Sequence, residues 1–89
     1  MLPTVIDDDP EVDILLGKDQ LTVIIDLRGR DSNKLLVKAN KRQLYVYDKE
    51  TNRVIKIISL PTYVEPESIK YETYYGTYIV SLKKVRTYE

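Results

Sequence analysis

The strongest constraint on the fold is a two-residue alternation of apolar and polar side chains that recurs along the chain. Its clearest instance is near the C-terminal end, where Tyr78, Val80 and Leu82 occupy every second position. In residues 20–27, every odd-numbered position is likewise apolar. This spacing places side chains on one face of a β-sheet. Because no ten-residue segment shows apolar residues at helical spacing, the chain is predicted to be all-β.

Turn-forming residues divide the chain into short strands. Clusters such as 17–19, 28–33 and 48–52 are rich in Gly, Asp, Asn and Lys, and they recur at the interval typical of a β-sandwich. The sequence therefore predicts a two-sheet, immunoglobulin-like sandwich of seven or eight short antiparallel strands over residues 12–85. Residues 1–11 are expected to form a flexible N-terminal arm and residues 86–89 a C-terminal tail. The expected strands are 12–16, 20–27, 35–39, 44–47, 53–60, 70–74 and 77–82.

Length and composition limit the broad class of protein. The chain has 89 residues, 43% of them apolar, which suits one small globular domain. No apolar run is long enough for a transmembrane helix, and no secretory signal opens the chain, so a cytoplasmic location is expected. Its charged fraction of 31% and its lack of Cys and Trp are typical of a thermophile protein.

No arrangement of residues indicates catalysis. The chain has no Cys and no His, which excludes disulfides, the usual zinc sites and histidine general bases. Its three glycines are far apart, so there is no phosphate-binding loop. The acidic run 7–9 lacks the spacing of a calcium loop. We therefore expect no enzyme activity, no cofactor and no metal site.

Charge and aromatic content bear on possible partners. Basic and acidic residues number 14 each, and a net charge of zero argues against nucleic-acid and membrane partners. Eight tyrosines could suggest single-strand binding by base stacking, but the sequence shows no basic groove to accompany them. They are interpreted instead as cross-strand packing residues with their hydroxyls at the rim. This interpretation covers Tyr45, Tyr47, Tyr71 and Tyr78.

Three segments, in the same order and spacing, resemble the alpha-crystallin domain of small heat-shock proteins. Residues 19–29, DQLTVIIDLRG, resemble the strand that ends in Asp-Leu-Pro-Gly in that family. Residues 33–49, NKLLVKANKRQLYVYDK, resemble the hairpin that follows. Residues 58–84, ISLPTYVEPESIKYETYYGTYIVSLKK, resemble the closing segment. The chain is also similar to CS-type co-chaperone domains and to the alpha-crystallin-like domain found beside arsenical-pump ATPases.

Several departures from the family pattern qualify the resemblance. Arg28 replaces the Pro of Asp-Leu-Pro-Gly, and Tyr75 replaces the Asn that precedes Gly76. A type I′ turn requires a positive φ at both positions and favours Asn first, so we expect a longer loop or bulge in which only Gly76 has a positive φ. Residues 48–52 replace the long loop that carries an exchanged strand in prokaryotic relatives. The family's N-terminal region and its Ile-X-Ile tail are also not seen, so we expect a monomer or weak dimer and not a large cage.

The resemblance implies an ATP-independent protein-binding module that holds unfolded clients or peptides through sheet edges and apolar surfaces in a stress response. The alternative is an accessory domain that docks on one partner, such as an arsenical-pump-like ATPase or a chaperone. The family's peptide groove would lie between strands 35–39 and 70–74. We expect it to be more polar than in cage-forming relatives, because Lys70 and Glu72 flank Tyr71. The predicted protein-binding residues are Leu36, Val37, Val54, Ile58, Lys70, Tyr71 and Glu72.

Overall fold

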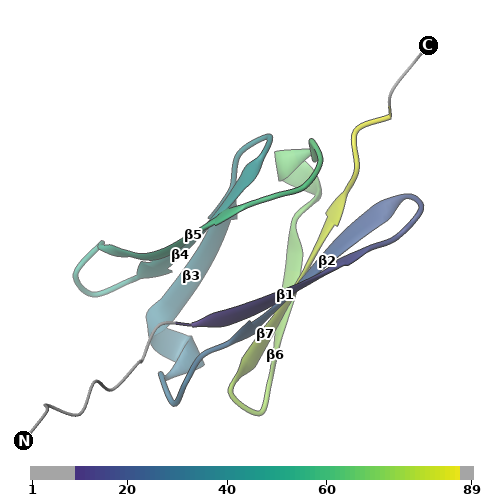
Figure 1. Cartoon of the computed structure of the whole chain (residues 1–89). Coiled ribbons are helices and arrows are strands. Elements are labelled where there is room, and N and C mark those ends of the chain that lie inside the picture. Colours follow the sequence, from purple (N-terminus) through teal and green to yellow (C-terminus); the bar gives the residue numbers. More distant parts are fainter. Residues whose placement is uncertain (1–9, 87–89) are drawn as a thin grey trace, which may run out of the picture.

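A computed structural model describes residues 10–86 and arranges them as two packed antiparallel sheets (Figure 1). The predicted all-β sandwich is confirmed, with seven strands and, in residues 10–86, no α-helix. Residues 1–9 of the expected arm and 87–89 of the expected tail lie outside this described part. The strands are β1 (Glu11–Leu16), β2 (Gln20–Asp26), β3 (Leu35–Ala39), β4 (Gln43–Asp48), β5 (Val54–Ser59), β6 (Lys70–Tyr74) and β7 (Thr77–Lys83); two 3-10 helices are η1 (Ser32–Lys34) and η2 (Pro66–Ser68).

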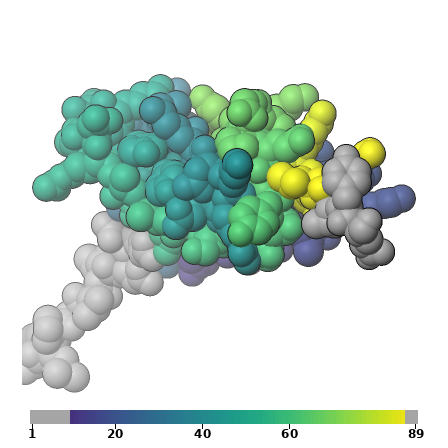
Figure 2. Space-filling view, turned by 90° about the horizontal axis from the view of Figure 1, so that it is seen from above, coloured from purple at the N-terminus to yellow at the C-terminus, as the bar shows by residue number. Residues whose placement is uncertain are grey.

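Within residues 10–86, the two sheets have four edge strands. The larger sheet has the order β1-β2-β7-β6, and the smaller has the order β3-β4-β5. The pairs β1–β2, β3–β4, β4–β5 and β6–β7 are hairpins, while β2 and β7, which are far apart in the sequence, pair within the larger sheet. In the space-filling view, the teal segment that contains β4 and β5 forms one end of the molecule, and the yellow end of β7 lies toward the other (Figure 2). The edge strands are β1 and β6 in one sheet and β3 and β5 in the other.

The core is built from the inward phase of the alternation. Val23 pairs with Val80, and Leu21 pairs with Leu82, in the β2–β7 ladder. All four side chains are at most 1% exposed, and they meet residues of the same phase from β3 and β4 across the sandwich. This confirms the predicted facing of both segments. The complete buried core is Leu21, Val23, Ile25, Leu27, Leu35, Val37, Leu44, Val46, Ile58, Leu60, Val64, Tyr78, Val80 and Leu82.

A β-bulge explains the irregular apolar pattern of β5. Val46 pairs with Lys56, and the next residue of β4 pairs with Val54, which leaves Ile55 as an extra residue. The bulge lets Ile55 pack against the core, although Ile57 on the same strand faces outward. Lys56 occupies the inward phase and is half-buried. Bulges and inward-facing charges both disfavour pairing of an edge strand with a second chain.

The turn between β6 and β7 differs from the expectation. Tyr74 pairs directly with Thr77, so the loop contains only Tyr75 and Gly76. Their φ values are 47° and 77°, whereas a positive φ was predicted for Gly76 alone. A two-residue hairpin loop that matches the strand twist requires both values to be positive. Edge-to-face contact of the Tyr74 and Tyr75 rings, with centroids 4.8 Å apart, accompanies this conformation.

Replacing Tyr75 with asparagine is therefore expected to stabilise the protein by about 1 kcal/mol, because Asn tolerates the left-handed conformation better than Tyr. The free energy of unfolding in denaturant measures the change. Gly76→Ala is the matched control. A Cβ at Gly76 meets no atom within 4 Å, so this variant adds only the backbone strain of a positive φ, and it should destabilise the fold. A loss of stability in Tyr75→Asn would show that the ring contact outweighs the backbone strain.

Candidate protein-binding site

Tyr78, on β7, connects the larger sheet to the beginning of β3, an edge strand of the smaller sheet. Its hydroxyl donates to the carbonyl oxygens of Ser32, at 2.6 Å, and Leu35, at 2.9 Å. The side chain is 1% exposed. Its hydroxyl therefore does not lie at the rim, and the position predicted from the sequence is wrong. The physical reason is its phase in β7, which it shares with the buried Val80 and which directs the ring into the sandwich. The beginning of β3 is thereby fixed to the sheet that contains β6.

Tyr71 extends this contact to the surface. Its ring meets the Tyr78 ring edge-on, with centroids 5.7 Å apart and planes at 84°, a favourable arrangement for aromatic pairs. Tyr71 remains 47% exposed, and all five residues of β6 are exposed. We call the surface formed by Tyr71 and the edge strands β3 and β6 the β3–β6 site. In residues 10–86, neither strand has a further strand at its outer edge, so the site offers strand edges beside an ordered aromatic side chain.

The predicted binding residues on β6 lie on two different faces. Tyr71 is on the inward phase opposite Val80, whereas Lys70 and Glu72 pair with Ser81 and Ile79 on the outer face. There they line a shallow hollow of about 290 Å³. The expected polar character of the groove therefore does not arise from Lys70 and Glu72, because strand alternation turns them away from the β3 side.

The predicted residues on the smaller sheet are also separated. Val37 and Ile58 are 4% and 6% exposed and belong to the core. Leu36 and Val54 instead face outward and lie on either side of Tyr47 in one cross-strand row. The structure thus distributes the seven predicted residues among the β3–β6 site, the core and two outer sheet faces.

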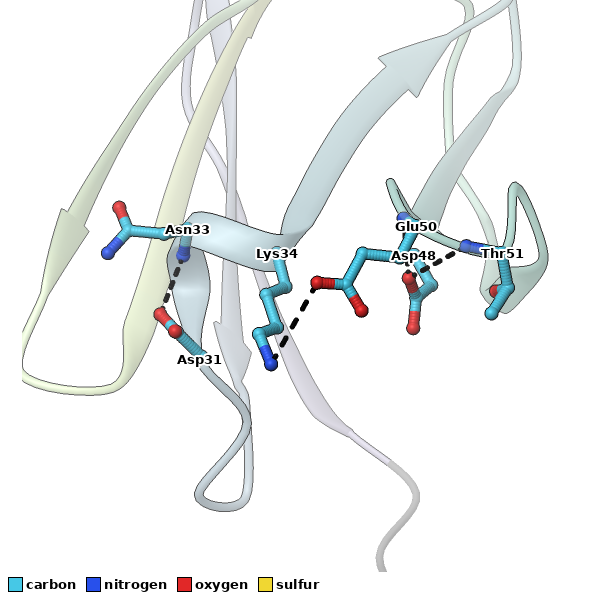
Figure 3. Close-up of polar contacts among 6 residues, drawn as sticks. All are labelled: Asp31, Asn33, Lys34, Asp48, Glu50 and Thr51. Carbon is cyan, nitrogen blue, oxygen red and sulfur yellow. Dashed lines mark hydrogen bonds and ion pairs between the residues drawn. The ribbon is translucent and has the colours of Figure 1, made fainter.

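A capped 3-10 helix positions the beginning of β3. Asp31 precedes η1, and its Oδ1 accepts a hydrogen bond from the Asn33 backbone N–H at 2.9 Å (Figure 3). This is the capping role for which Asp is favoured. It fixes the carbonyl of Ser32, which receives the Tyr78 hydroxyl. The sequence indicated a break in the strand here, and the structure shows that the break contains this short helix.

The β4–β5 turn is held closed against η1. Asp48 Oδ1 accepts hydrogen bonds from the backbone N–H groups of Glu50, at 2.8 Å, and Thr51, at 3.2 Å (Figure 3). The Lys34 carbonyl accepts from the Lys49 N–H at 2.8 Å. The exposed ion pair between Lys34 and Glu50, at 3.9 Å, adds little by itself. Backbone hydrogen bonds therefore make this segment part of the sandwich surface.

The environment of Tyr78 gives the protein an expected pH dependence. Burial raises the pKa of the Tyr78 hydroxyl above its ordinary value of 10.0, and Tyr71 and Asp31 raise it further. Above pH 10, the unfolded state loses this proton first, so the free energy of unfolding should fall as pH rises through the folded-state pKa.

Comparison of the free energy of unfolding between pH 8 and 11 for the wild type and Tyr78→Phe measures this contribution. The free energy of unfolding of the variant should fall less over this pH range, because the Tyr78 titration is removed while the other titrating residues are unchanged. An identical fall in the free energy of unfolding with pH in the two proteins would show that Tyr78 is not protected from titration.

Other surfaces in the described part of the chain show fewer features of a binding site. A hollow of about 890 Å³ lies at the end of β7 and mixes charges of both signs, including Lys18, Asp19, Glu65 and Lys83. Within residues 10–86, no three acidic, His or Cys residues gather as a metal site would need. No helix in that part of the chain is long and apolar enough to cross a membrane.

Comparisons with known proteins complete the description of the fold. No family model and no curated sequence matches the chain. Among solved structures, heat shock protein 16.0 from Schizosaccharomyces pombe superposes with a TM-score of 0.71 at 22% identity, covering 88% of this chain and 68% of that one. The chain has the alpha-crystallin fold. The two segments between which the sequence resemblance predicted a peptide groove, residues 35–39 and 70–74, are the edge strands β3 and β6.

Proposed function

We propose that this chain is a non-enzymatic, ATP-independent protein-binding module of the small heat-shock protein type. The observation that carries the proposal is the β3–β6 site, where the half-exposed Tyr71 lies on the edge strand β6. Tyr71 contacts Tyr78, which is hydrogen-bonded to the beginning of the other edge strand, β3. The likeness of the chain's fold to that of a small heat-shock protein supports the same proposal. Clients would be unfolded proteins or extended peptides.

The chemistry of the site suits an extended segment. The outward backbone groups of β6 have no neighbouring strand in the described sheet, so an added strand can supply the missing hydrogen bonds. Tyr71 offers an aromatic surface that is already ordered against Tyr78, which lowers the entropy cost of binding. Backbone hydrogen bonds would then supply affinity without strict sequence selection.

Suppression of aggregation tests this function. A heat-labile client should remain in solution when the chain is present at near-stoichiometric amounts without nucleotide. Tyr71→Asp should weaken the effect, while Tyr74→Asp, on the outer face of the same strand, should retain it. Failure of the wild type to protect any of several clients would count against the chaperone function.

A second candidate function is docking on one specific partner, such as an ATPase or a chaperone. The closed β4–β5 turn favours it, because this chain lacks at that position the extra strand through which prokaryotic relatives assemble. Affinity capture from the native extract separates the two functions. One dominant protein that survives competition by unfolded client supports docking, whereas many unfolded proteins support the chaperone function.

The same turn predicts the oligomeric state. Residues 49–53 separate β4 from β5, and five extended residues span under about 18 Å. Their backbone is also engaged locally, since the Asp48 N–H donates to the Arg53 carbonyl at 2.8 Å. This segment cannot exchange a strand with another subunit. We expect a monomer or weak dimer at micromolar concentration, and a single species above about four subunits in sedimentation velocity would contradict this.

A further inference from the structure

The outer face of the smaller sheet carries apolar and aromatic side chains in two adjacent cross-strand rows. The register aligns Leu36, Tyr47 and Val54 in one cross-strand row, and it aligns Tyr45 with Ile57 in the next. We call these five residues the outer aromatic face. The β4 and β5 parts of this sheet belong to the teal surface in Figure 2. Apolar sheet faces are normally covered by a second layer.

This face is exposed and already ordered. Val54 and Ile57 are 44% and 54% exposed, while the Tyr45 and Tyr47 rings lie 6.2 Å apart. The Tyr45 hydroxyl donates to Gln43 Oε1 at 2.7 Å and accepts from the Asn40 amide at 2.8 Å. The aromatic side chains therefore lose little conformational freedom when a partner binds.

The sheet that carries the face is strongly basic, although the chain as a whole is neutral. Residues 35–59 contain six Lys and Arg but only two acidic residues; Lys56, one of the six, lies on the inward phase of β5 and does not belong to the face. Of those acids, Asp48 caps the turn through its carboxylate, and Glu50 pairs with Lys34. Lys38 lies on the face itself, with its ammonium 5.5 Å from the centre of the Tyr47 ring. The surface thus favours an occupant that is both apolar and acidic.

The geometry also selects the secondary structure of the occupant. Backbone groups of the central strand β4 are paired with β3 on one side and β5 on the other. An occupant on the face must therefore satisfy its own backbone hydrogen bonds, which an α-helix does. Three strands spaced about 4.8 Å apart give a width near the 10–12 Å diameter of a helix. An extended peptide would instead need a free edge.

We propose that the outer aromatic face docks an amphipathic α-helix of a partner protein, with an apolar stripe flanked by Asp and Glu. Ile57, Val54 and the two tyrosines receive the apolar stripe. Lys38, which lies on the face beside Tyr47, contacts an acidic flank of the helix. This surface is separate from the β3–β6 site, which would take extended segments, so the two can be occupied at once.

A pair of synthetic helices tests the proposal. One probe of about 18 residues has a Leu stripe with Glu on its flanks, and its matched partner carries Lys in place of Glu. In fluorescence anisotropy with the full chain, the Glu helix should bind at least about tenfold more tightly and should weaken with added salt. Ile57→Glu and Lys38→Glu should each weaken binding by about tenfold or more. Tyr74→Glu, 64% exposed on the other sheet, should leave it unchanged.

Several results would overturn the proposal. Equal binding of the two helices would remove the charge argument, and equal binding by wild type and Lys38→Glu would place the helix elsewhere. Circular dichroism verifies that each variant is folded, and Lys38→Glu leaves the apolar residues intact. Displacement of the helix by a peptide of residues 1–10 would assign the face to the chain's own N-terminal segment. A wild-type dimer abolished by Ile57→Glu would assign it to a second copy.

Discussion

Replacing Tyr78 with alanine is expected to lower the free energy of unfolding by about 3–5 kcal/mol, because the buried ring fills space between the sheets. Tyr78→Phe retains the ring and loses only the hydroxyl that donates to Ser32 and Leu35, so it should cost about 1–2 kcal/mol. Denaturant unfolding at neutral pH measures both. Since small domains are stable by about 5–15 kcal/mol, the alanine variant should be close to its unfolding threshold.

Tyr74→Ala provides the control. This residue has the same chemistry and lies on the neighbouring strand, but it is 64% exposed, so its replacement should change the stability by no more than about 0.5 kcal/mol. Equal losses from Tyr78→Ala and Tyr74→Ala would contradict the role of Tyr78 as the connection between the sheets.

Replacing Val80 with aspartate is expected to abolish the folded state. Val80 is fully buried between Val23 of β2 and Tyr71 of β6 in the sheet register. A carboxylate there would lie in the apolar core, and burying a charge in such surroundings costs several kcal/mol. In the NMR spectrum, the backbone amide signals should show the narrow chemical-shift dispersion of an unfolded chain.

Ser81→Asp is the matched control, one residue away on the opposite face. Ser81 pairs with Lys70 of β6 and Thr22 of β2, so a carboxylate gains a nearby ammonium and remains partly solvated. Its effect should stay within about 1 kcal/mol. A Ser81→Asp variant that unfolds while Val80→Asp stays folded would show that the register of β7 is shifted by one residue.

The fold was predictable from the sequence because its main signals are local. The alternation of Leu21, Val23 and Ile25 depends only on the strand period, and the structure buries all three. The turns at 17–19 and 40–42 contain residues that favour turn conformations, and β-strands flank both. Each of these features is determined by residues a few positions apart.

Features that depend on tertiary structure were not predicted. The positive φ of Tyr75 follows from the direct pairing of Tyr74 with Thr77, which leaves no room for a longer loop. The hydrogen bonds of Tyr78 join residues 43 and 46 positions apart. The same tyrosine shares its alternation phase with Val80, and that pattern was the signal for a buried ring.

The candidate surfaces were predicted only in part for the same reason. Tyr71 was predicted as a binding residue together with Lys70 and Glu72, but the register of β6 places those two on the other face. Leu36 and Val54 of the outer aromatic face were predicted as binding residues, but the face itself was not predicted because its rows combine residues from three strands. The bulge that offsets Val54 from Ile57 cannot be located without knowing how β4 and β5 pair.

Titration with an Ile-X-Ile peptide, followed through the backbone amide signals, tests the central claim of a protein-binding site between β3 and β6. The largest shifts are predicted along β6 and β3, with smaller ones at Tyr78, and Tyr71→Asp should reduce them about tenfold at equal peptide concentration. Tyr74→Asp should leave them unchanged. Shifts confined to β1, β2 or β5, or no shifts at millimolar peptide, would contradict the assignment of protein binding to this site.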